Sequence, residues 1–210
     1  MKRLVIIGAG GHGKVAADIA LLSGFKDIRF VDDDASLLGT RVLGFPVVGS
    51  LDSADVHSDS DDVFVAVGNA SVRKSVFSTL ASRGIVPVTL CHPSTCIGRD
   101  VRIGAGTLLA AGAIVNPGAN VGKGGIVNTG ATVDHDCFIG DFCHVSVGAH
   151  VAGTVTVGEG TWIGAGAVVS NNVDIVSGCM IGAGAVVVND ITVTGTYVGV
   201  PARLMKRGVE

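Results

Sequence analysis

Two adjacent residues near the middle of the chain, His135 and Asp136, have side chains suited to acid–base chemistry. Histidine accepts a proton near neutral pH, and a neighbouring carboxylate can fix the imidazole tautomer and stabilise the imidazolium. His135 is therefore a candidate general base, and Asp136 is the group that would orient it. The alternative is that His135 is a solvated surface histidine, which needs no catalytic explanation.

A second candidate site is the glycine-rich segment Gly8–Gly13, which fits G-x-G-x-x-G. It follows a short apolar run at Leu4–Ile7 and precedes helical spacing at Lys14–Leu22, and Asp32 comes nineteen residues after its last glycine. Glycines in this context allow close backbone approach to a pyrophosphate at a helix N-terminus. A region of about 90 residues is short for a full dinucleotide domain, so a mononucleotide diphosphate fits better. The alternative is that the glycines only make a tight turn.

The elements that would carry this loop alternate between strand and helix, which predicts a small parallel α/β sheet. Ser71 is a plausible N-cap for the main helix, and the boundary with the following region lies near Cys91–Ser94. The expected elements are strands at Leu4–Ile7, Ile28–Val31, Phe45–Val48, Val63–Val67 and Val86–Leu90, helices at Lys14–Leu22 and Ser71–Arg83, and a helical turn at Asp52–His57.

The region that would carry His135 has a strict hexapeptide period. Every sixth residue from Ile97 to Val193 is aliphatic, without a slip in phase. The position four residues later is mostly small. This period predicts a parallel β-helix, with three hexads in each triangular coil of eighteen residues. The small residues are Thr107, Ala113, Ala119, Gly125, Ala131, Cys137, Cys143, Ala149, Thr161, Ala167, Cys179 and Ala185.

The coil length predicts which residues stack beside His135. Gly153 follows it by eighteen residues, one whole coil, so the two should lie about one strand spacing, roughly 4.8 Å, apart. A glycine there would leave room beside the imidazole. His144 falls at the end of a hexad, which we interpret as a position near a corner of the triangle.

Composition narrows the classes of function. The net charge is -3, without a basic block, so nucleic acid is not suggested as a partner. No apolar run reaches the roughly 18 residues of a spanning helix, so membrane insertion is not expected. Three of the five cysteines, Cys137, Cys143 and Cys179, occupy small inward positions of the repeat. Free buried cysteines suit a reducing compartment, so we expect a cytoplasmic protein.

Four segments together resemble the hexapeptide-repeat sugar acetyltransferases of the sialic-acid and bacillosamine type. They are GAGGHGK near the N-terminus, AVGN at Ala66–Asn69, VDHD at Val133–Asp136 and GVPARL at Gly199–Leu204. The resemblance is closest to nucleotide-sugar 4-N-acetyltransferases that act on UDP-bacillosamine precursors or on GDP-perosamine. It implies acetyl-CoA as cosubstrate, no metal, and an N-acetyltransferase active on the 4-amino group of a nucleotide-linked 4,6-dideoxy sugar for surface glycans, with a UDP-sugar favoured.

The resemblance also implies an architecture. A Rossmann-like α/β domain (residues 1–90) would bind the nucleotide sugar, a left-handed parallel β-helix (91–194) would carry acetyl transfer, and a tail (195–210) would lie near CoA. The prisms would associate as a homotrimer with CoA in the groove between neighbours.

Specific residues take roles only through this resemblance. His135 would be the base and Asp136 its partner, although many relatives have the longer Glu there. The residues implied to contact acetyl-CoA are His144, Gly153, Pro201, Ala202 and Arg203, with Lys206 and Arg207 facing the 3′-phosphate or simply solvated. Those implied to hold the nucleotide are Gly10, Gly11, His12, Gly13, Asp32, Gly68 and Asn69.

Three other functions stay open at this point. An O-acetyltransferase acting on a sialic acid or similar sugar would share the fold, the histidine and CoA. A zinc enzyme of the hexapeptide type needs three histidines around one metal, and His135, His144 and His150 lack the spacing of that family. A non-catalytic nucleotide-sugar-binding protein would bind the sugar without turning over CoA.

Overall fold

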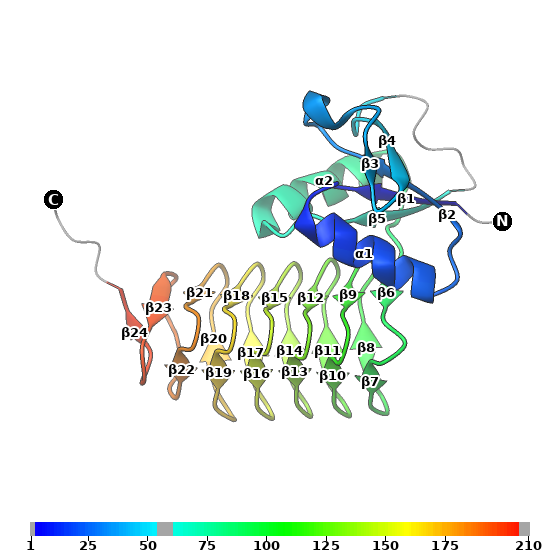
Figure 1. Cartoon of the computed structure of the whole chain (residues 1–210). Helices are drawn as coiled ribbons and strands as arrows, with labels where there is room; N and C mark the ends of the chain where they lie inside the picture. The colour runs from blue at the N-terminus through cyan, green and yellow to red at the C-terminus, as the bar shows by residue number, and fades with distance from the viewer. Residues whose placement is uncertain (1–2, 54–60, 206–210) are drawn as a thin grey trace, which may run out of the picture. The chain divides into compact units, whose positions relative to one another are not determined.

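The computed structural model describes residues 3–53 and 61–205 of the chain. It divides into two compact units, Met1–Pro93 and Ser94–Glu210. The first is an α/β unit and the second is a parallel β-solenoid (Figure 1).

The first unit is built on one sheet with the strand order β3-β4-β2-β1-β5. The last four strands are parallel, and only β3 runs antiparallel to β4. Strand β1 lies inside the sheet, between β2 and β5, and its residues Leu4, Val5 and Ile6 are fully buried, as expected of a parallel strand with both faces covered. The elements are β1 (Arg3–Ile7), α1 (Gly11–Leu22), β2 (Asp27–Val31), the 3-10 helix η1 (Ala35–Leu37), β3 (Arg41–Val42), β4 (Phe45–Gly49), β5 (Asp62–Val65), α2 (Ala70–Ser82) and β6 (Leu90–Cys91).

The prediction of a small parallel α/β sheet is confirmed, but three of its details are wrong. Of the predicted strand at Val86–Leu90, only Leu90 lies in a described strand, as the first residue of β6. Pro87 has no N–H to donate, and the N–H of Val88 bonds to Val63 O (2.8 Å). The cap of α2 is Asn69 and not Ser71, and β5 ends at Val65 rather than Val67. Most of the helical turn predicted at Asp52–His57 lies outside the described residues.

The second unit is a solenoid of short strands, and each coil contributes one strand to each of three parallel sheets (Figure 1). We call the three flat sides face 1, face 2 and face 3. Face 1 contains β7 (Cys96–Ile97), β10 (Ile114–Val115), β13 (Thr132–Val133), β16 (His150–Val151), β19 (Val168–Val169) and β22 (Val186–Val187). Face 2 contains β8 (Arg102–Ile103), β11 (Asn120–Val121), β14 (Phe138–Ile139), β17 (Thr156–Val157) and β20 (Asp174–Ile175). Face 3 contains β9 (Leu108–Leu109), β12 (Ile126–Val127), β15 (His144–Val145), β18 (Trp162–Ile163), β21 (Met180–Ile181), β23 (Thr196–Val198) and the antiparallel β24 (Arg203–Leu204).

The hexapeptide period is confirmed as the source of the solenoid core. Partners in neighbouring coils are eighteen residues apart, as in Val115 with Val133 and Val133 with Val151. The fourteen hexad aliphatics from Leu109 to Val187 each expose no more than 2% of their surface. The predicted small inward residues are buried as well, including the three cysteines of the repeat.

The hexad aliphatics are no longer buried at the two ends of the solenoid. Ile97 is 49% exposed because β7 is the terminal strand of its sheet, and Val193 is 58% exposed. At the C-terminal end of the solenoid the register shifts by two residues, since Ile191 and not Val193 bridges to Ile175. Ile191 is buried in its place. The expectation of an unbroken phase to Val193 is therefore wrong.

Among the described residues, no helix has both the length and the apolar character required to cross a bilayer.

Candidate active site

His135 and Asp136 form the turn between β13 on face 1 and β14 on face 2. Asp136 has a positive φ of 57°, a left-handed conformation that Asp tolerates better than most residues. This backbone geometry brings the two neighbouring side chains together, with Nδ1 of His135 2.9 Å from Oδ2 of Asp136. Both side chains are more than half exposed. The shorter Asp therefore reaches the ring at hydrogen-bonding distance.

The preceding coil supports this turn through contacts eighteen residues away. Oδ1 of Asp134 accepts hydrogen bonds from Nδ2 of Asn116 (2.7 Å) and from the backbone N–H of His135 (2.8 Å). At Gly118, an added Cβ would lie only 2.6 Å from Oδ1 of Asp136. In the preceding coil, the Asn116 side chain therefore holds the turn that carries His135, and Gly118 leaves space for the side chain of Asp136.

The following coil places Gly153 against the imidazole, as its spacing predicts. A Cβ at position 153 would lie 2.5 Å from Nε2 of His135, so no other residue type fits beside the ring without displacing it. The N–H of Thr154 donates to the carbonyl of His135 (2.9 Å), which fixes the two turns relative to each other. Within the described ranges, the backbone N–H of Gly153 donates to no acceptor.

Neighbouring carboxylates make His135 easier to protonate. Its pKa is raised above the ordinary 6.5, mainly by the hydrogen bond with Asp136. Burial opposes this shift, and the charges of Asp134 and Asp136 add smaller raising effects. The pKa of Asp134 is lowered, first by the Asn116 hydrogen bond and then by the His135 N–H. The lowered pKa of Asp134 keeps a negative charge next to the imidazole.

His144 lies in a different place from the one expected. It is not at a corner but in β15 on face 3, where it is buried. Its ring stacks on Trp162, one coil further on, with centroids 5.2 Å apart and planes inclined by 11°. Its Nε2 lies 3.1 Å from Nδ2 of Asn128.

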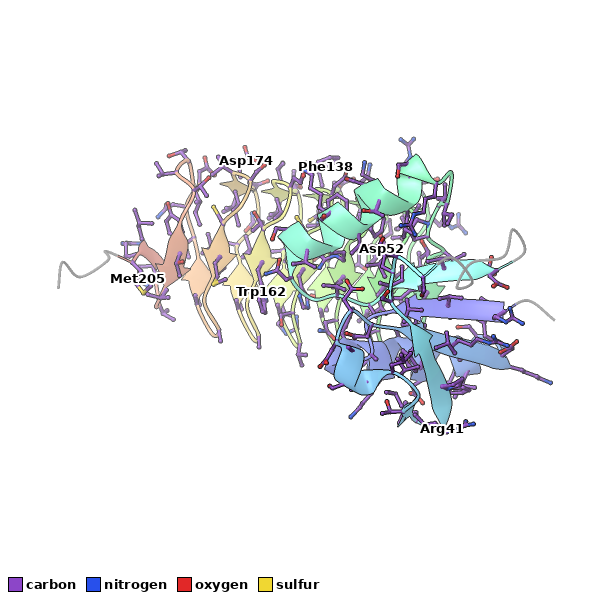
Figure 2. All side chains as sticks on the ribbon, turned by 90° about the horizontal axis from the view of Figure 1, so that it is seen from above. Arg41, Asp52, Phe138, Trp162, Asp174 and Met205 are labelled. Atoms are coloured by element: carbon purple, nitrogen blue, oxygen red, sulfur yellow. The ribbon has the colours of Figure 1, made fainter. Side chains whose placement is uncertain are left out.

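A single chain does not bring His144 and His135 together. Nine residues are half of an eighteen-residue coil, and the turn between faces 1 and 2 lies opposite face 3 across the triangle. Figure 2 shows this separation of faces, with Phe138 and Asp174 of face 2 along one side and Trp162 of face 3 away from it. His150 lies on face 1, with Nδ1 3.0 Å from Oγ1 of Thr132. No group of three His, Cys, Asp or Glu side chains in the described part of one chain is placed to hold a metal ion.

The glycine-rich segment connects β1 to α1 in the first unit. Gly8 has a φ of 105°, and a Cβ there would lie 2.8 Å from the carbonyl oxygen of Ala66. Gly13 packs directly against the Gly8 carbonyl, whereas Gly10 and Gly11 have open space beside them. A side chain would therefore not fit at Gly8 or Gly13, the two ends of the loop, whereas there is free space beside Gly10 and Gly11 in its middle.

Asp32, predicted to contact a nucleotide, is held by the loop itself. Its Oδ2 accepts the N–H of Ala9 (2.7 Å) and its Oδ1 accepts the N–H of Asp34 (2.9 Å). Asp32 therefore fixes the glycine-rich segment at the end of β2. Asn69 caps α2, with Oδ1 accepting the N–H of Val72 (3.1 Å).

Three supporting residues escaped the sequence analysis. Asn116 and Trp162 stand eighteen residues from Asp134 and His144, so the coil length contained the signal that would have found them. Arg73 on α2 is 1% exposed, and its Nη1 donates to the carbonyls of Val67 (2.8 Å) and Gly68 (2.7 Å). No spacing rule predicts that contact.

The predicted CoA-contacting tail lies in the hairpin formed by β23 and β24. The Val200–Pro201 peptide is cis, and Nη1 of Arg203 donates to the carbonyl of Ala202 (2.8 Å). Pro201 and Arg203 are exposed. Lys206 and Arg207 lie outside the described residues.

Comparison with known proteins finds similar sugar N-acetyltransferases. The PglD N-terminal domain family model matches residues 3–80. The chain is 31% identical over 144 residues to GDP-perosamine N-acetyltransferase of Escherichia coli O157:H7, covering 65% of this chain and 64% of that protein. It is 35% identical over 119 residues to UDP-N-acetylbacillosamine N-acetyltransferase of Bacillus subtilis (strain 168), covering 53% and 52%. These alignments span between half and two thirds of the curated relatives' lengths.

Two solved structures match over nearly the whole chain. The acetyltransferase domain of PglB from Neisseria gonorrhoeae FA1090, in complex with acetyl coenzyme A, is 40% identical with a TM-score of 0.93, covering 97% of this chain and 99% of that one. PerB from Caulobacter crescentus, in complex with CoA and GDP-perosamine, is 36% identical with a TM-score of 0.91, covering 98% of both. The resemblance inferred from the motifs is therefore confirmed, and the chain belongs to the hexapeptide-repeat acetyltransferase family that includes PglB and PerB.

Proposed function

We propose that this protein transfers the acetyl group of acetyl-CoA to the 4-amino group of a nucleotide-linked 4-amino-4,6-dideoxy sugar. A UDP-sugar is the favoured acceptor and GDP-perosamine the second. The observation that carries this proposal is the arrangement of His135 between the Asp136 carboxylate and the Gly153 backbone. The proposal is supported by relatives whose names specify N-acetylation of bacillosamine or perosamine sugars.

In the proposed reaction, Asp136 accepts the Nδ1–H of His135, which leaves Nε2 as the basic nitrogen. The sugar amine attacks the thioester carbonyl, and Nε2 removes a proton from that nitrogen directly or through a water molecule. The C–S bond then breaks, the amide forms, and the leaving CoA thiolate takes up the proton that Nε2 of His135 had accepted. Asp136 stabilises the transient imidazolium.

The N–H of Gly153 is the proposed donor to the oxyanion that develops on the thioester carbonyl. Its support is geometric, because Gly153 lies beside Nε2 of His135 and its N–H makes no bond within the described residues. A fixed donor aimed at developing charge typically contributes about 10²–10³ in rate.

We propose a homotrimer with left-handed prisms and acetyl-CoA in the groove between neighbours. The argument is the placement of the two histidines on opposite sides of one prism. If His144 contacts the acetyl group at the site of His135, it must come from a neighbouring copy. Face 3 also carries exposed apolar side chains in register, with Trp162 41% and Met180 47% exposed. A symmetric assembly would cover them.

We assign binding of the nucleotide to the first unit, and contact with CoA to the tail. Gly10, Gly11, His12 and Gly13 with Gly68 and Asn69 would contact the nucleotide, and Asp32 would hold the loop. Pro201, Ala202 and Arg203 would lie at the adenine end of CoA. Because acetyl-CoA and nucleotide sugars are cytoplasmic metabolites and the cysteines are free, the cytoplasm is the proposed compartment.

The direct test is thiol release from acetyl-CoA by purified protein, with UDP-, GDP- and dTDP-linked 4-amino-4,6-dideoxy sugars and hydroxylated analogues as acceptors. Release with one amino sugar, above the rate of spontaneous hydrolysis, is the expected result. Release only with a hydroxylated sugar would contradict N-acetylation and assign an O-acetyltransferase. Nucleotide-sugar binding without any release would contradict the enzyme proposal.

A further inference from the structure

The further inference concerns Arg73, a buried charged residue to which the proposed reaction gives no role. Arg73 lies in the first turn of α2, four residues after the cap Asn69, and its N–H donates to the Asn69 carbonyl (2.9 Å). Its side chain is almost fully buried, and the guanidinium Nη1 donates to two successive carbonyls, those of Val67 and Gly68. Burying a guanidinium is costly, and hydrogen bonds to a charged donor are stronger than neutral ones.

These two bonds determine which way the adjacent N–H groups point. In a trans peptide the carbonyl and the N–H lie on opposite sides of the bond. The Val67 carbonyl shares a peptide with the N–H of Gly68, and the Gly68 carbonyl shares one with the N–H of Asn69. Because Arg73 holds both carbonyls toward the buried side of α2, both N–H groups are directed away from it. In the described ranges, neither N–H donates to a protein acceptor.

The segment that presents these N–H groups packs against the glycine-rich segment. Strands β1 and β5 are parallel neighbours, so the loops that follow them emerge at the same edge of the sheet. Gly8 approaches the Ala66 carbonyl so closely that a Cβ would not fit. Ligands of open α/β sheets bind at the carboxyl ends of the strands, which is this edge.

Arg73 also acts electrostatically on the glycine-rich segment. The pKa of His12 is lowered to about 4, mainly by burial and further by the positive charge of Arg73. Arg73 therefore influences residues of both loops at this edge.

We propose that Arg73 is a positioning residue for the nucleotide part of the acceptor. It orients the peptides Val67–Gly68 and Gly68–Asn69 so that their two N–H groups face acceptor atoms of the bound nucleotide. This inference rests on the proposed function, because it assumes that the first unit binds a nucleoside diphosphate.

The test compares three variants with the wild-type protein. Arg73→Met removes the guanidinium at similar length, and Arg73→Lys keeps the charge with a single donor group. Arg83→Met is the matched control, because Arg83 makes a comparable bond to the Leu51 carbonyl (2.8 Å) away from this loop. Titration calorimetry measures the dissociation constants of UDP, GDP and acetyl-CoA, and thermal unfolding reports on the fold.

We expect Arg73→Met to weaken binding of the preferred nucleoside diphosphate by about tenfold or more, as for loss of hydrogen bonds from a charged donor. The nucleotide affinity of Arg73→Lys should lie between those of Arg73→Met and the wild type. Arg83→Met should bind the nucleotide as tightly as the wild type. Acetyl-CoA affinity should stay the same in all four proteins. With the amino-sugar acceptor, KM should rise while kcat changes by less than about twofold.

Unchanged nucleotide affinity in Arg73→Met would overturn the inference, as would an equal loss of acetyl-CoA affinity, which would indicate general disruption. If Arg73→Met does not fold, the nucleotide affinity and the acetyl-CoA affinity of Arg73→Lys are compared with those of the wild type instead. A wild-type protein that binds neither UDP nor GDP would refute the nucleotide acceptor itself, and the inference with it. That failure is distinct, because it appears before any variant is measured.

Discussion

Nδ1 of His135 and Oδ2 of Asp136 lie 2.9 Å apart, although the two residues are adjacent in sequence and both side chains face solvent. The left-handed backbone of Asp136 makes this contact possible. The contact leaves Nε2 of the imidazole on the side of Gly153, where the proposed reaction takes place.

Replacing His135 with Ala should lower kcat by at least about 10², which is the low end for loss of a general base. Thermal unfolding should change little, because the side chain is exposed. His150→Ala removes another exposed histidine of the same solenoid and is the matched control. Steady-state kinetics check the prediction, and near-wild-type kcat in His135→Ala would rule out its role as base.

The activity should depend on pH through the same histidine. The active form has neutral His135, and its pKa is raised by the hydrogen bond with Asp136, so kcat/KM should fall as the pH decreases through a value above 6.5. In Asp136→Asn the carboxylate is lost, and the acidic limb should therefore move to lower pH while the plateau rate falls. An acidic limb that stays in place in Asp136→Asn would show that another group titrates.

Gly153→Ala should inactivate the enzyme without unfolding it. The new Cβ would overlap the imidazole at 2.5 Å from Nε2, so the ring must move, and a displacement of about 1 Å can cost about 10² in rate. Asn171→Ala, one coil further along the same corner, is the control and should retain activity. Equal activity in Gly153→Ala and the wild type would contradict the proposed geometry.

His12 should remain neutral across the physiological range. Its pKa is lowered to about 4, so its imidazole C–H resonances should not shift between about pH 5 and 8. His135 provides the comparison within the same molecule, because its resonances should titrate above 6.5. An NMR titration distinguishes the two, and a His12 that titrates near 6.5 would show that its site is open to water.

The repeat made the solenoid predictable because its phase and its burial have the same cause. One aliphatic residue in six must point inward on each flat face, and the buried series from Leu109 to Val187 follows that rule. The eighteen-residue coil also predicted Gly153 beside His135. At Ile97 the period still holds, but the terminal strand of the sheet is not covered, so the side chain is exposed. The phase itself fails only at Val193, where Ile191 takes the inward position.

At the site, the structure differs from the prediction for His144 and adds the contacts of Arg73. The hexad position of His144 predicts a corner, but half a coil from His135 puts it on the opposite face, as the eighteen-residue period requires. The contacts of Arg73 depend on how α2 packs against the loop after β5, which is a tertiary arrangement without a sequence period. The cap of α2 is Asn69 and not Ser71, because the Asn69 side chain accepts the N–H of Val72.

The central claim, transfer of an acetyl group to nitrogen, is tested most directly by the structure of the product. The protein would be incubated with acetyl-CoA carrying a ¹³C-labelled carbonyl and with the amino-sugar acceptor carrying ¹⁵N at C4, and the product analysed by NMR. We predict an amide in which the label couples to the nitrogen at C4 of the sugar, formed by the wild type and not by His135→Ala. A labelled ester, or an amide formed equally by His135→Ala, would contradict the account.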